Sequence, residues 1–184
     1  MRNSRTKYAI LGWLSREPMT GYDLKKKTEA NLAFFWSESY GQIYPILHKM
    51  EKDGLVTMVE DREEGRPPKK IYSITDIGKE SLLLWMKKKP DKDVFRSELL
   101  LKLFFSQCCG PEIIKKHIQE RMDDSRAKLR EYDEMMARMA LNRNDDPAFS
   151  YWTMAVEFGI NSELASIDWC KQTLNNLESF EKKE

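Results

Sequence analysis

The sequence predicts a mainly α-helical protein with a small β-hairpin, arranged as a winged helix-turn-helix followed by a helical dimerisation domain. In the first half, three short helical patterns precede two β-prone runs and a fourth helical pattern. The second half carries two long apolar seams. Residues 1–90 hold 17 Lys or Arg against 12 Asp or Glu, a net +5, whereas residues 91–184 hold 14 against 18, a net −4. We therefore expect two domains, 1–90 and 91–184, with a polyanion suited to the first.

Apolar residues at helical spacing predict three helices at the start of the chain. The segments are residues 7–14, 20–32 and about 41–53. Thr20 is a suitable N-cap for the second helix, and Gly54 is a stop signal for the third. Because proline is tolerated mainly in the first turn of a helix, Pro45 indicates that the third helix becomes regular near residues 41–44.

A hairpin and a fourth helix follow. Residues 55–59 and 71–74 are β-prone and flank a charged Gly/Pro turn at 63–70. Thr75 or Asp76 can then cap a helix that fades into a Lys-rich tract. Three helices, a hairpin and a helix form the order of a winged helix-turn-helix. In that arrangement the third helix enters the major groove of DNA and the hairpin contacts the backbone or the neighbouring minor groove.

Hydrogen-bonding side chains gather where the third helix begins, and three cations surround the two prolines of the hairpin. These residues are Ser39, Tyr40, Gly41, Gln42 and Tyr44 in the helix, and Arg66, Lys69 and Lys70 in the hairpin. Helix N-termini and cations both suit phosphate. A charged turn can equally be a solvated loop, and Tyr44 a core aromatic. The order of all the features together favours DNA binding.

The second half predicts three helices. Phe95, Leu99 and Leu103 belong to one that ends before Gly110–Pro111. Spacings of three and four then continue through two long segments, as two helices packed side by side require. The seams are Ile114, Ile118, Met122, Ser125, Leu129, Tyr132, Met136 and Met139, then Phe149, Trp152, Val156, Ile160, Leu164, Ile167, Cys170, Leu174 and Leu177. Seams of this length exceed what one antiparallel hairpin can bury, which predicts a homodimer.

Several classes of function are disfavoured. No apolar run is long enough to span a membrane and the start of the chain does not resemble a cleavable signal, so we expect a soluble, cytoplasmic protein. Cys108 and Cys109 are neighbours, which suits reduced thiols better than a disulfide framework. His48 and His117 stand outside any metal-ligand spacing. Without a nucleophile–base motif or a phosphate-binding glycine loop, we predict no enzyme, no catalytic residue, no metal and no cofactor.

The chain resembles the PadR-like transcriptional regulators over residues 7 to about 85. The resemblance rests on YAILGWLSREPMTGYDLKKK, on Phe35–Trp36, on GQIYPILHKMEKDGLV and on RPPKKIYSITDIGKE. By its length, its helix order and the segment Glu98–Phe105, the second half is similar to the C-terminal domain of the longer subfamily, which includes phenolic-acid-responsive repressors.

The resemblance implies a homodimer, held by the C-terminal helices, that binds an inverted-repeat operator in double-stranded DNA and represses a gene until a small aromatic effector releases it. The implied DNA contacts are Thr20, Tyr22, Ser39, Gly41, Gln42, Tyr44, Lys49, Arg66, Lys69 and Lys70. The effector-binding candidates near the joint of the two domains are Trp85, Phe95, Phe104 and Trp152. Aromatic residues at helical spacing are also common in cores, so these four have that second interpretation.

A protein-interaction module is the alternative function. In that case the helical arm binds a protein partner and the winged helix is only a structural platform. Salt-dependent binding to DNA separates the two hypotheses, since neutralising phosphates releases counterions.

Overall fold

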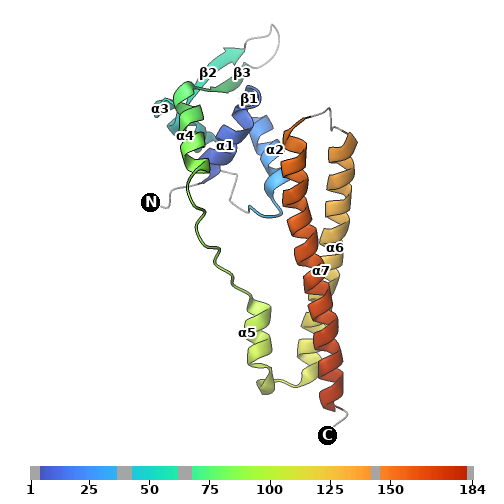
Figure 1. Cartoon of the computed structure of the whole chain (residues 1–184). Helices are drawn as coiled ribbons and strands as arrows, with labels where there is room; N and C mark the ends of the chain where they lie inside the picture. Colours follow the sequence, from blue (N-terminus) through green and yellow to red (C-terminus); the bar gives the residue numbers. More distant parts are fainter. Residues whose placement is uncertain (1–4, 37–42, 62–67, 142–145, 182–184) are drawn as a thin grey trace. The chain divides into compact units, whose positions relative to one another are not determined.

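The computed structural model describes residues 5–36, 43–61, 68–141 and 146–181 (Figure 1). The chain divides into two compact units, Met1–Lys92 and Asp93–Glu184, each of which has its own internal packing. The structure is mainly helical with one small antiparallel sheet, as the sequence predicts. In the part of the chain that the structure describes, no helix has both the length and the apolar character needed to cross a membrane.

The first unit has the element order of a winged helix-turn-helix (Figure 1). Its helices are α1 (Thr6–Leu14), α2 (Gly21–Leu32), α3 (Ile43–Lys52) and α4 (Asp76–Met86), and its strands are β1 (Met19–Thr20), β2 (Val56–Asp61) and β3 (Lys69–Ile74). Pro45 lies in the first turn of the described part of α3, in agreement with the predicted start of that helix.

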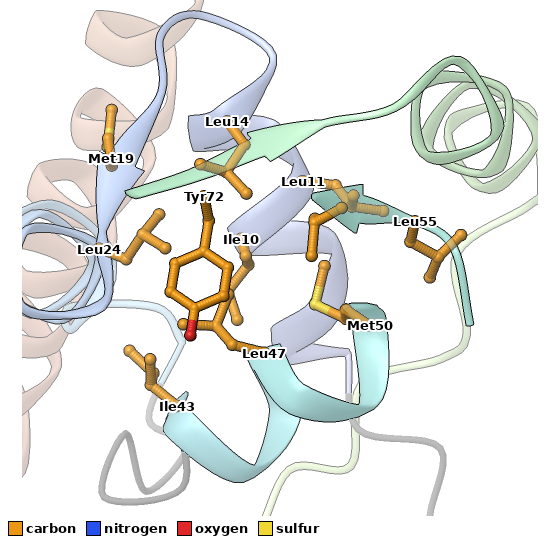
Figure 2. Close-up of a cluster of buried hydrophobic side chains, with 11 residues drawn as sticks. Ile10, Leu11, Leu14, Met19, Leu24, Ile43, Leu47, Met50, Leu55 and Tyr72 are labelled. Carbon is orange, nitrogen blue, oxygen red and sulfur yellow. The ribbon is translucent and has the colours of Figure 1, made fainter. Parts of the chain in front are cut away.

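One hydrophobic core joins these elements. Figure 2 shows the Tyr72 ring of β3 among side chains from α1, α2 and α3, with Ile10, Leu24 and Leu47 around it. Tyr72 is 1% exposed, and the other three are fully buried. Because Tyr72 fills the space between the helices and the sheet, the base of the hairpin is anchored to α2 and α3.

Local capping explains where the helices start and stop. The Oγ1 atoms of Thr20 and Thr75 accept hydrogen bonds from the N–H groups of Asp23 and Gly78, at 3.1 and 3.0 Å. Both N-caps were predicted, and both satisfy backbone donors that a helix start leaves unpaired. Gly54 ends α3 with φ +70°, a left-handed conformation that favours glycine.

The sheet has one strand more than the sequence predicts. β1 pairs antiparallel with β3, and β3 pairs with β2, in the order β1-β3-β2. β1 has two residues, which is too short for the alternation that identifies a strand. In the hairpin, Val56 lies opposite Ile74 and Asp61 opposite Lys69, so the register brings acidic and basic residues together at its outer end.

The second unit contains α5 (Glu98–Phe104), the short 3₁₀ helix η2 (Ser106–Cys108), α6 (Pro111–Leu141) and α7 (Ala148–Glu181). α6 and α7 lie side by side as a long helical hairpin (Figure 1). Its core includes Ile114, Ile118, Ile167 and Cys170. α5 starts after the N-cap Ser97, so Phe95 precedes the helix to which the sequence assigned it.

The seam of α7 differs from the prediction, and Trp152, near the start of the helix, is 37% exposed. Ile160 is only half-buried and Leu164 is 46% exposed, whereas Gly159 and Glu163 are buried. Glycine is required at 159 because a Cβ atom there would lie 2.7 Å from the Cζ atom of Tyr132 on α6. The Tyr132 ring therefore packs directly on the α7 backbone, and this contact sets the rotation of α7.

A charged cluster occupies the middle of this helical hairpin. The Glu163 carboxylate accepts hydrogen bonds from Arg121 Nη2 at 3.2 Å and from Lys128 Nζ at 3.3 Å. Arg121 Nε also donates to Ser166 Oγ at 3.0 Å. Glu163 is 7% exposed, and a buried carboxylate is tolerated when it is paired in this way.

Candidate nucleic-acid interface

An open groove of about 680 Å³ lies on the first unit, between the start of α2, α3 and the outer part of the hairpin. Its lining residues are Pro18, Met19, Thr20, Gly21, Tyr22, Asp23, Tyr44, Asp61, Pro68, Lys69, Lys70 and Ile71. Helix, strand and hairpin thus contribute polar side chains to one surface, which is the arrangement that contact with a nucleic-acid backbone requires.

The start of α2 forms one side of the groove. Thr20 caps the helix, and its hydroxyl also donates to Asp23 Oδ2 at 2.7 Å. Tyr22 projects from the first turn and is 65% exposed. The N-terminus of a helix carries a partial positive charge, so this end of α2 suits a phosphate.

Tyr44 connects α2 with α3. A Cβ atom at Gly21 would lie 2.7 Å from Tyr44 Cε1, so the glycine allows the tyrosine ring to lie against the first turn of α2. The ring is nevertheless 52% exposed. Tyr44 is therefore not a core aromatic. It forms a supported, accessible surface at the start of α3, and the corresponding helix of helix-turn-helix proteins is the one that enters a major groove.

Lys69 and Lys70 form the hairpin side of the groove. Both are exposed at the start of β3, where Asp61 and Glu60 of β2 lie opposite them. The burial of Tyr72, two residues further along β3, raises the pKa of its phenol, and the nearby charges of Glu51 and Tyr44 raise it further. This neutral, buried ring fixes the strand from which the two lysines project.

The structure brings together five of the ten predicted DNA contacts, Thr20, Tyr22, Tyr44, Lys69 and Lys70. Lys49 is exposed on α3 but does not line this groove. The other four predicted contacts, Ser39, Gly41, Gln42 and Arg66, lie outside the described residues.

The sequence interpretation did not place Gly21, Asp23 or Asp61 in the groove. The spacing from Thr20 to Asp23 matches a capping box and could have indicated Asp23. Asp61 has no comparable signal, since its position depends on the register of the hairpin.

The four effector candidates have different environments. Trp85, in the first unit, stacks on Tyr8 with 4.5 Å between ring centroids. In the second unit, Phe95 is 81% exposed, Phe104 is 77% exposed and Trp152 is 37% exposed. One face of Trp85 is therefore occupied by an internal contact, while the other three rings are accessible within their own unit. The assignment of these residues to an effector site stays a prediction.

No group of three or more His, Cys, Asp or Glu able to hold a metal ion occurs among the residues that the structure describes. The groove combines hydroxyl, phenol, ammonium and carboxylate groups. A winged helix-turn-helix that presents such a surface defines a DNA-binding transcriptional regulator.

Comparison with known proteins gives the family. Residues 10–83 match the Transcriptional regulator PadR-like family, and residues 95–178 match the family described as Virulence activator alpha C-term. The chain belongs to the PadR-like family of transcriptional regulators and has the longer C-terminal domain, as the sequence motifs indicated.

Relatives support this over nearly the whole chain. The Negative transcriptional regulator PadR of Bacillus subtilis strain 168 is 28% identical over 91% of this chain and 94% of its own length. The crystal structure of B. subtilis PadR in complex with operator DNA superposes with a TM-score of 0.82, 25% identity, and coverage of 93% and 98% of the two chains. The structure of the Vibrio cholerae virulence activator AphA superposes with a TM-score of 0.75 at 27% identity, and the match covers 95% of this chain and 99% of that one.

Proposed function

We propose that this protein is a homodimeric repressor that binds an inverted-repeat operator through the winged helix. The observation that carries the proposal is the groove in which Thr20, Tyr22, Tyr44, Lys69 and Lys70 converge. B. subtilis PadR, whose fold is shared over most of the chain, is known in complex with operator DNA. Repression is the expected direction because the relative that matches over 91% of this chain is a negative regulator.

Within the groove we assign two kinds of contact. Lys69, Lys70 and the α2 start at Thr20 contact phosphates, which fixes the orientation of the protein without reading sequence. Tyr44 projects from the start of α3 and contributes to base recognition. The protein-interaction alternative does not explain why polar side chains from three elements share one surface.

The surface of α7 supports a homodimer. Tyr151, Met154 and Phe158 are 73%, 62% and 72% exposed, and their spacing of three and four places them on one side of the helix. Val156 and Ile167, which are buried in the helical hairpin of α6 and α7, point to another side of α7. A row of large exposed apolar residues is characteristic of an interface, and a two-fold axis would make it self-complementary.

A small aromatic effector completes the proposal. B. subtilis PadR is also known in complex with p-coumaric acid, at a TM-score of 0.78 and 26% identity to this chain. We assign Trp85, Phe95, Phe104 and Trp152 as candidate effector contacts, because planar aromatic acids stack on aromatic rings.

DNA binding is tested with a fragment from upstream of the protein's own gene and a random fragment of equal length. Lys69→Ala and Lys70→Ala should each weaken binding to both fragments and lower the slope of log K against log salt by about one unit. Lys79→Ala, which removes an exposed charge on α4 outside the groove, is the matched control. Tyr44→Ala should cost about 1–3 kcal/mol more on the operator than on random DNA. Wild-type protein without salt-dependent DNA binding would refute the proposal.

Dimerisation is tested separately on the full chain by sedimentation. Phe158→Glu should shift the protein to monomer, since an interface cannot accommodate an unpaired buried charge. Asn175→Glu adds the same charge at an exposed position about 100° away around α7 and should leave the dimer intact. Equal behaviour of the two variants contradicts the assigned face.

A further inference from the structure

The groove assigned to DNA contains as many acidic as basic side chains. Lys69 and Lys70 line it together with Asp23 and Asp61. The same balance extends along the hairpin, where residues 60–70 contain four Asp or Glu and four Lys or Arg. A surface that bound phosphate only for affinity would carry an excess of cations. The acidic residues therefore need an explanation.

Asp23 has a structural role that accounts for it. Its backbone N–H donates to Thr20 Oγ1, and its carboxylate accepts from the Thr20 hydroxyl at 2.7 Å. It also lies in the first turn of α2, where the helix dipole stabilises a negative charge. The Thr20 hydroxyl and the helix dipole therefore offset much of the negative charge of the Asp23 carboxylate.

Asp61 is placed differently. It is the exposed last residue of β2, opposite Lys69 in the antiparallel register, and its side chain lines the groove. Among the residues that the structure describes, no helix begins at this strand end to offset its charge. A phosphate that approached Lys69 in the groove would come within a few ångströms of the Asp61 carboxylate, well inside the Debye length of about 8 Å at physiological salt.

We propose that Asp61 is a charge brake on DNA binding, meaning a carboxylate that repels phosphate in the groove and holds affinity below the level that Lys69 and Lys70 would give alone. The inference rests on the proposed function of the groove. Because backbone contacts carry no sequence information, the brake lowers affinity for operator and random DNA alike. When contacts to the DNA backbone contribute less to the free energy of binding, a smaller change in the protein is enough to release it from its operator.

A purely structural role for Asp61 makes the opposite prediction. Opposite charges on paired strands stabilise a hairpin, and here Asp61 would serve only to hold Lys69. Removing the carboxylate would then loosen the hairpin and weaken DNA binding. A charge brake predicts tighter binding, so the sign of the effect separates the two roles.

The experiment compares the full-length wild type with Asp61→Asn by fluorescence anisotropy on operator and random DNA over a series of salt concentrations. Asp61→Asn should bind both about three- to fivefold more tightly at 0.1 M salt, with the ratio between the two DNAs unchanged and the gain shrinking as salt rises. Asp53→Asn makes the same change of net charge at an exposed turn outside the groove, and should bind as the wild type does.

Three outcomes overturn the charge brake while leaving the proposed function in place. The first is unchanged or weaker binding of Asp61→Asn to both DNAs. The second is a loss confined to the operator, which would make the carboxylate an acceptor for a base amino group. The third is an equal gain in Asp53→Asn, which would make net charge the cause. Wild-type protein that fails to bind DNA refutes the proposed function itself, and the brake with it.

Discussion

Gly78 controls how closely α4 approaches the sheet, and Gly78→Ala tests this contact. A Cβ atom at this position would lie 2.2 Å from the backbone oxygen of Leu55 and 2.8 Å from Ile74 Cγ1. The first contact is about 1 Å too short and involves backbone, which cannot rotate away as a side chain can. Helix α4 would have to move away from the start of β2.

The expected cost combines two opposing terms. Alanine is favoured over glycine within a helix by about 0.8–1 kcal/mol. Overpacking a buried site costs about 1–3 kcal/mol, and more where the backbone must shift. The overlap at Leu55 lies at the severe end of this range, so we expect Gly78→Ala to lower the free energy of unfolding by about 2 kcal/mol after the helix gain is subtracted.

Gly12→Ala is the matched control. Gly12 is also helical, but a Cβ atom there would have no neighbour within 4 Å. This variant should therefore gain up to about 1 kcal/mol from helix propensity alone. Urea denaturation followed by circular dichroism measures the free energy of unfolding of both variants. We expect the urea midpoint to shift while the m value stays constant. If Gly78→Ala were as stable as Gly12→Ala, the close approach of α4 to Leu55 would be wrong.

Three further predictions concern the second unit. Glu163→Ala should destabilise the protein in urea by about 1–3 kcal/mol, because Arg121 and Lys128 lose their shared partner while staying partly solvated, whereas Glu157→Ala on the exposed side of α7 should have little effect. Iodoacetamide should label exposed Cys108 in the native protein and buried Cys170 only after unfolding, so early labelling of Cys170 by mass spectrometry would contradict its burial. Burial raises the pKa of the Cys170 thiol. The contribution of this thiol to the free energy of unfolding should therefore be complete below the ordinary thiol pKa and be lost as pH rises through the raised pKa. Cys170→Ala should flatten the dependence of the free energy of unfolding on pH in that range.

The features that could be predicted from sequence are those decided by neighbouring residues. Thr20 and Thr75 cap helices through hydrogen bonds to residues three positions on, and Gly54 ends α3 by its own backbone conformation. The hairpin follows from two β-prone runs around a Gly/Pro turn. These local rules were enough for the order of elements, and hence for the class of fold and the approximate position of the groove.

The features that could not be predicted depend on contacts between distant segments. β1 is a strand only because Met19 and Thr20 meet Tyr72 and Ile71 of β3. Apolar character favoured Leu164 for the seam of α7, but the packing of Tyr132 on Gly159 rotates the helix so that a different residue faces α6. The position of Asp61 in the groove likewise follows from strand register.

The buried charge at Glu163 also determines how far α7 can slide along α6. Two long helices joined by apolar side chains can often exchange one alignment for another that is shifted by a turn, about 5.4 Å, at little cost. Arg121 and Lys128 lie seven residues apart on α6, so such a shift would move the carboxylate away from one of the two and leave a buried charge with a single partner. The double pairing therefore favours one alignment of α7 along α6, and sliding one helix past the other would cost the protein a buried ion pair.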